Sequence, residues 1–215
     1  MHNVVVVGGG PAGLSAALAA AAAGAPVLLI DSNSRLGGQY WRNSSDNFDD
    51  QHEQHFDLET GLLLINAVKA RKEIEVWSEA QIWSATNNDG KSTLRVIYQG
   101  KEKIVNTANI ILCTGAYDRT LPFPGWDIPG VMTPGGVQSL LKGHGVLAGK
   151  RVVVAGTGPF LLPVAAGVIK AGGEVVSLLE ANKSRRWLTS FNVILENIGK
   201  LKEAFYYIKT ISEGK

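Results

Sequence analysis

The chain has 215 residues, of which 45% are hydrophobic and 19% charged, and its formal net charge is +2. This composition is typical of a globular protein and not of a disordered one. The small net charge argues against nucleic acid or an anionic membrane as a partner. Its single cysteine, Cys113, excludes an intramolecular disulfide and a dithiol redox centre, and it favours a cytoplasmic location.

The N-terminal residues predict a strand, a glycine turn, a helix and a second strand in that order. Residues 3–7 form a β-branched run that suits a strand buried on both faces. Pro11 suits the first position of a helix over 11–23, and Gly24 suits its end. Residues 26–31 form the second strand. The segment is apolar but lacks a basic leader, so we do not expect a membrane span or a secretory signal.

The turn between the first strand and the helix has the spacing Gly8-x-Gly10-x-x-Gly13. The first glycine permits a tight turn, the second lets the backbone approach a diphosphate, and the third lets helix and strand pack closely. The start of the helix offers unpaired N–H groups and a partial positive charge to the phosphates. Asp31 ends the second strand, where a carboxylate can accept hydrogen bonds from a ribose. This order predicts a dinucleotide site.

The middle of the chain predicts further elements of the same domain. Cys113 lies in an apolar run, so we expect it to be a small buried residue. His52 and His55 are too few for a metal site, and no metal is expected. The expected elements are a surface loop over 42–57, a helix over 58–71, strands over 74–86 and 93–99 joined by a turn at Asn88-Asp89-Gly90, and a buried strand over 104–113.

The opening pattern then returns after a segment rich in proline and glycine. His144, within that segment, is expected in a loop. The second turn begins at Gly156, as the first begins at Gly8. The expected elements are a linker over 121–149, a strand over 150–155, a turn over 156–159, a helix over 160–171, a strand over 174–180 and an amphipathic helix over 191–211.

Together these patterns predict an α/β protein with two dinucleotide-binding, Rossmann-like βαβ units and parallel sheets, the first unit carrying a small antiparallel insertion. We expect a dinucleotide-binding domain over 1–120, the linker over 121–149, and the start of a second dinucleotide-binding domain over 150–215.

Four segments resemble the flavoproteins that have two dinucleotide-binding domains, the thioredoxin-reductase-like class. Residues 4–17 (VVVVGGGPAGLSAA) look like its FAD fingerprint, residues 35–42 (RLGGQYWR) like its diglycine segment, and residues 111–119 (ILCTGAYDR) like its exit from the FAD domain. Residues 115–138 (GAYDRTLPFPGWDIPGVMTPGGVQ) resemble the branch that contains opine oxidase A subunits, a hydrogen cyanide synthase subunit and the α subunits of proline and hydroxyproline dehydrogenases.

The resemblance implies that residues 1–120 form an FAD-binding domain and that residues 150–215 are the incomplete start of an NAD-type domain. It also assigns residues to the FAD. The diphosphate would lie on the glycine turn, the adenosine ribose at the end of the second strand, and the rest of the cofactor along the diglycine and exit segments; turn or packing chemistry is the alternative for each. The implied residues are Gly8, Gly10, Pro11, Ala12, Gly13, Asp31, Ser32, Gly38, Gln39, Thr114 and Gly115.

The second glycine turn departs from the family pattern. Gly156 and Gly158 are present, but Leu161 stands where a third glycine would sit and should hold helix and strand further apart. Pro163 falls in the early helix, where it can strain the backbone. Glu180 is placed for a ribose hydroxyl, which would favour NAD(H) over NADP(H). The alternative is a βαβ unit that binds no nucleotide tightly.

Two basic residues follow this second unit. Arg185 and Arg186 could meet a phosphate, but a solvated basic patch explains them better.

The resemblance also implies a function. It predicts an FAD-dependent oxidoreductase subunit that oxidises an amine, imino acid or opine-type small molecule, or relays its electrons, together with a partner subunit. The Gly-Asp dipeptide that completes the FAD site in this class is missing, so we expect the chain to be truncated. No catalytic residue is assigned. The alternatives are an inactive fragment of a longer flavoenzyme and a non-catalytic nucleotide-binding subunit.

Overall fold

A computed structural model describes residues 2–42, 58–182 and 198–213. The chain divides into two compact units at the bond between Ala116 and Tyr117. The described part of unit 1 consists of residues 2–42 and 58–116, and that of unit 2 of residues 117–182 and 198–213. Each unit has its own parallel sheet and its own apolar core.

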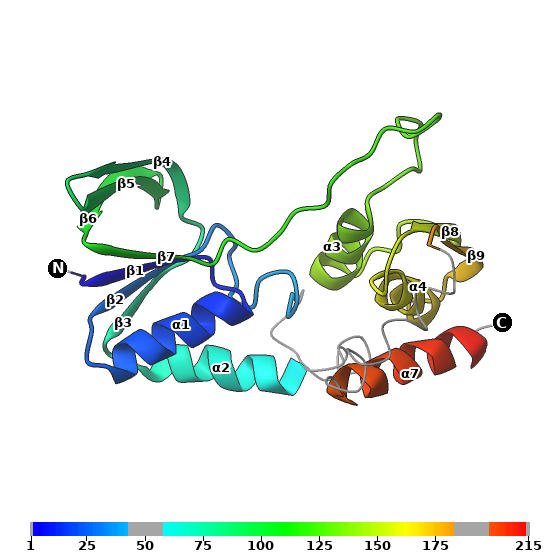
Figure 1. The fold of residues 1–215 in the computed structure, drawn as a ribbon, viewed down its shortest axis with the longest axis horizontal. Helices are drawn as coiled ribbons and strands as arrows, with labels where there is room; N and C mark the ends of the chain where they lie inside the picture. The colour runs from blue at the N-terminus through cyan, green and yellow to red at the C-terminus, as the bar shows by residue number, and fades with distance from the viewer. Residues whose placement is uncertain (1, 43–57, 183–197, 214–215) are drawn as a thin grey trace. The chain divides into compact units, whose positions relative to one another are not determined.

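Unit 1 is built on a four-stranded parallel sheet with the order β3-β2-β1-β7 (Figure 1). The strands are β1 (Val4–Val7), β2 (Val27–Ile30), β3 (Ile74–Trp77) and β7 (Asn109–Leu112). The first strand lies inside the sheet, because Val4 pairs with Val27 on one side and with Asn109 on the other. The carboxyl ends of β1, β2 and β7 therefore meet at one edge, where ligands bind in open α/β sheets.

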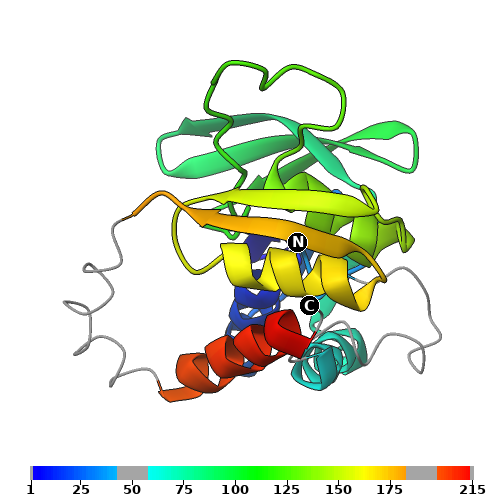
Figure 2. The same ribbon diagram turned by 90° about the vertical axis from the view of Figure 1, so that its right-hand side faces the viewer.

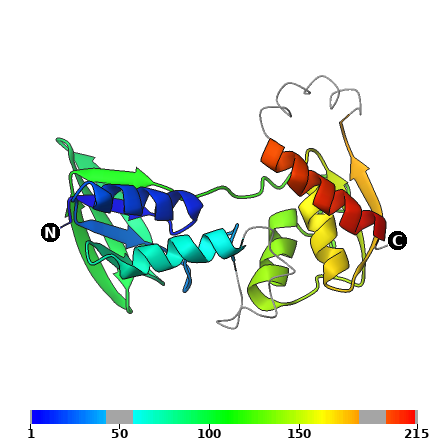
Figure 3. The ribbon, with the colours of Figure 1, turned by 90° about the horizontal axis from the view of Figure 1, so that it is seen from below.

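Both faces of this sheet are covered, which explains its continuous apolar strands. Two helices that lie side by side, α1 (Pro11–Ala22) and α2 (Leu58–Ala70), cover one face (Figure 3). A three-stranded antiparallel sheet covers the other; it consists of β4 (Gln81–Asn88), β5 (Lys91–Tyr98) and β6 (Lys101–Thr107). Side chains alternate between two cores: Val6, Val27 and Leu29 pack toward the helices, and Val5, Leu28 and Ile30 toward the antiparallel sheet.

The predicted fold class is confirmed, but two strand predictions were wrong. The strand predicted over 74–86 is two strands, β3 and β4, which belong to different sheets; Glu79, with φ of +55°, lies between them. The strand predicted over 104–113 is likewise divided between β6 and β7. The hairpin turn at Asp89 and Gly90 is confirmed, and both residues have positive φ. Cys113 is only partly buried, contrary to prediction, because it follows an edge strand.

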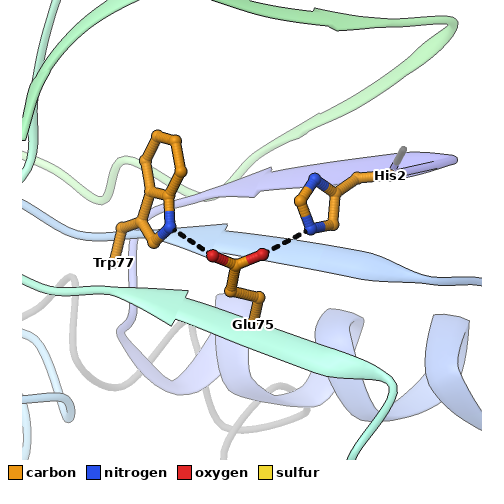
Figure 4. Close-up of polar contacts among 3 residues, drawn as sticks. All are labelled: His2, Glu75 and Trp77. Carbon is orange, nitrogen blue, oxygen red and sulfur yellow. Dashed lines mark hydrogen bonds and ion pairs between the residues drawn. The ribbon is translucent and has the colours of Figure 1, made fainter. Parts of the chain in front are cut away.

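A polar cluster links the start of the chain to β3. Glu75 accepts a hydrogen bond from the indole Nε1 of Trp77 at 2.8 Å, and its other carboxylate oxygen lies 2.8 Å from Nε2 of His2 (Figure 4). The Trp77 ring stacks on Tyr98 with ring centroids 4.6 Å apart, which joins β3 to the antiparallel sheet. The cluster therefore ties the first residues of the chain and the antiparallel sheet to β3.

Unit 2 contains a second, smaller βαβ unit with additional helices. Parallel strands β8 (Arg151–Gly156) and β9 (Glu174–Glu180) flank the helix α4 (Leu161–Lys170), which packs on both strands (Figure 2). Helix α3 (Pro134–His144) and helix α7 (Ile198–Glu213) pack against α4. Within the described residues the parallel sheet of this unit has only these two strands.

The pairing of β8 with β9 contains an irregularity that is absent from the pairing of β1 with β2. Val152 pairs with Val175, but Val153 pairs with Ser177, so Val176 is an extra residue in β9. Compared with β2 beside β1, β9 therefore uses one more residue to span the same length of its partner strand, β8. The bulge absorbs one extra residue of sequence and so brings Glu180 opposite Gly156, as Asp31 follows the pair Val7–Ile30 opposite Gly8.

Two predictions for the second half need correction or restriction. The linker predicted over 121–149 contains the helix α3, and His144 is the last residue of that helix instead of a loop residue. The helix predicted over 191–211 is described from Ile198 to Glu213, and the preceding residues, with Arg185 and Arg186, lie outside the described residues, as does most of the loop predicted over 42–57. None of the described helices combines the length and hydrophobicity needed to cross a membrane.

Candidate functional site

The glycines of the first turn are fixed by close backbone contacts. A Cβ on Gly8, which has φ of +103°, would lie 2.2 Å from the carbonyl oxygen of Cys113. A Cβ on Gly13 would lie 1.7 Å from the carbonyl oxygen of Gly8, so α1 and β1 approach as closely as the sequence pattern predicts. By contrast, the Cβ position of Gly10 meets only the Cα of Gly38, at 3.7 Å. The backbone packing therefore requires that the first and third glycines have no side chain.

The start of α1 carries unpaired backbone donors. Pro11 is the first helical residue and has no N–H, and the first bond of the helix runs from the N–H of Leu14 to the carbonyl of Gly10 at 2.9 Å. No described residue accepts from the N–H groups of Gly10, Ala12 or Gly13, and Gly10 caps the helix without a side chain. Such a group of aligned donors, at the positive end of a helix, is suited to a diphosphate.

Asp31 lies at the end of β2, as predicted, and is buried with 5% of its surface exposed. Its Oδ2 accepts a hydrogen bond from the N–H of Gly9. Its Oδ1 accepts from Asn33, from the backbone N–H at 2.6 Å and from the side-chain amide at 2.8 Å. Three donors leave one free lone pair on Oδ2 for a ribose hydroxyl. The carboxylate thus holds the glycine turn against the end of β2, and the neighbouring Ser32 is exposed.

The segment after β2 folds back over the glycine turn. The N–H of Gly37 donates to the carbonyl of Gly9 at 2.8 Å, and Gly38, with φ of +62°, lies against Gly10. The side chain of Gln39 donates from Nε2 to the carbonyl of Ala116 at 3.1 Å, which brings it beside the exit segment after β7. Thr114 and Gly115 in that segment are exposed. The predicted cofactor-binding residues of unit 1 therefore converge at one edge of the sheet.

The second turn repeats the contact of a carboxylate with a glycine amide. Glu180 Oε2 accepts from the N–H of Gly158 at 3.0 Å, and Oε1 accepts from the N–H of Asn182 at 2.9 Å. The hydrogen bond from the Asn182 backbone, with further ones from Gly158 and Thr157, holds the pKa of Glu180 below its ordinary value. Both turns are thus held by the acid that ends the following strand.

The helix after the second turn begins differently from α1. Aligning Gly156 with Gly8 places Pro159 opposite Pro11, yet α4 begins only at Leu161. Pro163 has no N–H to donate to the carbonyl of Pro159, which instead accepts from the N–H of Leu162 at 3.1 Å. The Leu161 N–H donates to the carbonyl of Gly158 at 3.3 Å. The start of α4 is therefore a tight turn whose amides bond internally.

Leu161 stands at the sequence position of the third glycine of unit 1. Its side chain is 6% exposed, and its Cδ2 would lie 3.1 Å from a Cβ placed on Gly156. It belongs to the apolar core of unit 2, with Val154, Val164 and Ala165. The leucine is thus a core residue that fills the contact between α4 and β8.

Sequence reasoning missed Asn33, which donates twice to Asp31. A signal was present, because each acid is followed two positions later by an asparagine: Asp31 by Asn33 and Glu180 by Asn182. In both units the backbone N–H of that asparagine donates to the acid. As for other chemistry, the described residues bring no three side chains of His, Cys, Asp or Glu together, and His52 and His55 lie outside them.

A dinucleotide fits the first turn. The turn presents three unpaired amides, a Cβ-free approach at Gly10, and a carboxylate at the end of the next strand. This arrangement can hold a diphosphate and an adjacent ribose.

Comparison with known proteins places this geometry in a family. The family model described as pyridine nucleotide-disulphide oxidoreductase matches residues 2–193. The chain is 34% identical to the A subunit of opine oxidase from Agrobacterium tumefaciens (strain Ach5), with 85% of this chain and 37% of the relative covered. It is 35% identical to the hydrogen cyanide synthase subunit HcnB of Pseudomonas protegens, with 83% of this chain and 38% of the relative covered.

A solved structure shows the same fold. L-proline dehydrogenase from P. horikoshii matches with a TM-score of 0.69 and 24% sequence identity, over 82% of this chain and 35% of that one. The chain thus spans well under half the length of these relatives. From the family model that matches most of its length, together with the glycine turn that the fold presents, the chain belongs to the pyridine nucleotide-disulphide oxidoreductase family, whose members imply a flavin cofactor.

Proposed function

We propose that the chain is the FAD-binding part of an oxidoreductase subunit that oxidises an amine, imino acid or opine-type small molecule, or relays its electrons. One observation carries the proposal: the N–H groups of Gly10, Ala12 and Gly13 at the start of α1 have no acceptor within the described residues. Amides left unpaired at a helix start are suited to a diphosphate, and FAD contains one.

Each part of the site would have a separate task in holding the cofactor. The three amides would bind the diphosphate, and the free lone pair of Asp31 would accept from the adenosine ribose. The segment with Gly38 and Gln39 would cover the cofactor from the side of the exit segment. When bound, FAD supplies the capacity to accept a hydride, while the protein orients it.

The relatives support the substrate class and the need for a partner chain. Relatives found by sequence are named as subunits of opine oxidase, hydrogen cyanide synthase and sarcosine oxidase, enzymes whose names imply more than one chain. We infer that this chain likewise works with another subunit. We also propose a cytoplasmic location, on the ground that the sequence has a single cysteine and so no intramolecular disulfide.

Absorbance of the purified protein tests the proposal. Bound flavin should give an absorbance band near roughly 450 nm after incubation with FAD and removal of excess cofactor. Calorimetry with FAD and with ADP separates this function from the two alternatives. Tighter binding of ADP than of FAD would favour a non-catalytic nucleotide-binding subunit, and the absence of binding to either would favour an inactive fragment.

The variant Gly10→Val tests the assigned position of the diphosphate. A branched side chain would stand between the backbone and the phosphates, so we expect FAD affinity to fall by roughly 2 kcal/mol, about 30-fold. Gly149→Val is the matched control, because a Cβ at Gly149 in unit 2 would meet its nearest neighbour only at 3.8 Å. Equal FAD affinity of the two variants would contradict the assignment.

A further inference from the structure

The second glycine turn resembles the first in sequence but differs from it in the amides it leaves open. Aligning Gly156 with Gly8 places Gly158, Phe160 and Leu161 opposite Gly10, Ala12 and Gly13, the three residues whose N–H groups are unpaired in unit 1. The second turn can therefore be compared with the first amide by amide.

Two of the three corresponding amides are already bonded within unit 2. The N–H of Gly158 donates to Glu180 at 3.0 Å, and the N–H of Leu161 donates to the carbonyl of Gly158 at 3.3 Å. Phe160 keeps an N–H without a described acceptor, but it stands before α4 and does not belong to the helix. Thr157, the counterpart of Gly9, also keeps an N–H without a described acceptor. A diphosphate at this turn would therefore find two donors, both before the helix, where the first turn offers three, two of them within α1.

The side chain that closes the turn is Glu180, and its reach has a structural cause. In unit 1 the shorter Asp31 bonds to Gly9, which leaves the N–H of Gly10 open. Glu180 lies at the equivalent position, opposite Gly156, but has one more methylene group, and it bonds to Gly158, the counterpart of Gly10. The hydrogen bond from the acid to a turn amide therefore leaves the N–H of Gly10 open in unit 1 and occupies the N–H of Gly158 in unit 2.

We propose that Glu180 closes the second glycine turn, so that the chain binds no nicotinamide dinucleotide there and holds a single dinucleotide, on the first turn. A nicotinamide dinucleotide, which the family name suggests for a second site, does not fit the residues of unit 2. Glu180 is then a structural residue that holds Gly158 and Asn182, and not a ligand of a ribose. Electrons from a substrate leave this chain by a route other than a nicotinamide dinucleotide on the second turn.

Titration of the full chain with NADH, NADPH and FAD tests this proposal separately from the proposed function. We expect no saturable binding of NADH or NADPH at the second turn, whether or not FAD binds. Saturable binding of NADH or NADPH that Glu180→Gln weakens at least tenfold, and that Gly10→Val leaves unchanged, overturns the inference. Failure of FAD to bind would remove the proposed function and leave this inference standing.

The thermal midpoint of the ligand-free chain gives a second readout. If Glu180 closes the turn, Glu180→Gln lowers this midpoint, because glutamine has one acceptor oxygen in place of two and cannot accept from both Gly158 and Asn182. Glu174→Gln, at the exposed start of the same strand, is the matched control, because its carboxylate makes only a solvent-exposed ion pair with Arg151, and such pairs contribute little to stability. A ribose ligand would leave the ligand-free midpoint equal in the two variants, and that result also overturns the inference.

Discussion

Gly38 lies directly against Gly10, so closely that a Cβ on Gly38 would come within 2.8 Å of the Gly10 Cα. The diglycine segment thus covers the one glycine of the turn whose own Cβ position is nearly free. This contact joins two motifs that the sequence places far apart, and it makes Gly38 part of the wall of the site.

Gly38→Ala should weaken both the fold and cofactor binding. The alanine would meet the Gly10 backbone and would have to adopt φ of +62°, which costs roughly 1–2 kcal/mol before any clash. Gly90→Ala is the matched control, since it has φ of +75° but nothing within 4 Å of a Cβ. We expect FAD affinity, measured by titration, to fall at least about tenfold in the first variant only. Equal FAD affinity in both would show that the contact with Gly10 is unimportant.

Gly13→Ala should be far more damaging than Gly10→Ala. The methyl group on residue 13 would lie 1.7 Å from a backbone oxygen, so α1 must move away from β1, whereas at residue 10 the nearest atom is at 3.7 Å. We expect Gly13→Ala to lose about 3 kcal/mol or more of unfolding free energy, and Gly10→Ala to lose less than about 1 kcal/mol. Urea unfolding of the ligand-free proteins measures both. Similar midpoints would contradict the close packing of α1 on β1.

Asp31→Asn should destabilise the ligand-free chain. An asparagine has one acceptor oxygen and would turn an NH₂ group toward the N–H of either Gly9 or Asn33. Leaving a buried donor without an acceptor costs about 1–3 kcal/mol of unfolding free energy. The exposed Ser32→Ala, next to it, should change this free energy by less than about 0.5 kcal/mol. If chemical denaturation finds the two variants equally stable, Asp31 does not hold the turn.

The contribution of the Glu180 carboxylate to the stability of the folded chain should be lost in acid. Because hydrogen bonds hold the pKa of Glu180 below its ordinary 4.5, this carboxylate stabilises the folded chain above pH 4.5. That stabilisation should disappear as the pH falls from 4.5 through the lower pKa of the folded state. The thermal midpoints of the wild type and Glu180→Gln should therefore differ near neutrality and converge in acid. A difference that stays constant over this range would contradict the assigned contacts.

The sequence predicts the first unit well because its chemistry is local. The run of valines, Pro11 at the helix start and Gly24 after its end each have one favoured structure, and all three predictions are confirmed. The glycine spacing also predicts the close contact of Gly13 with Gly8. Where the conformational preference of each residue determines the local structure, that structure can be predicted from the sequence alone.

Other features depend on contacts that a linear pattern does not show. The alternation over 74–86 continues through Glu79, which adopts a positive φ that only tertiary contacts impose on a glutamate. Helix α3 was missed because Pro134 and the two glycines after it are typical of a linker, yet Pro134 is its first residue and Thr133 caps it. The position of Glu180 opposite Gly156 could not be predicted either, since it depends on the bulge at Val176.

Strand β1 precedes both of its sheet neighbours in the chain, yet it occupies the interior of their sheet. Val4 pairs with Val27 on one side and with Asn109 on the other, so one edge of β1 stays unpaired in the nascent chain until β7 has emerged from the ribosome. During that time the edge can pair with a strand of another molecule. A chaperone present during expression should therefore raise the yield of folded protein. A shorter chain ending before Asn109 would keep this edge open permanently and should aggregate.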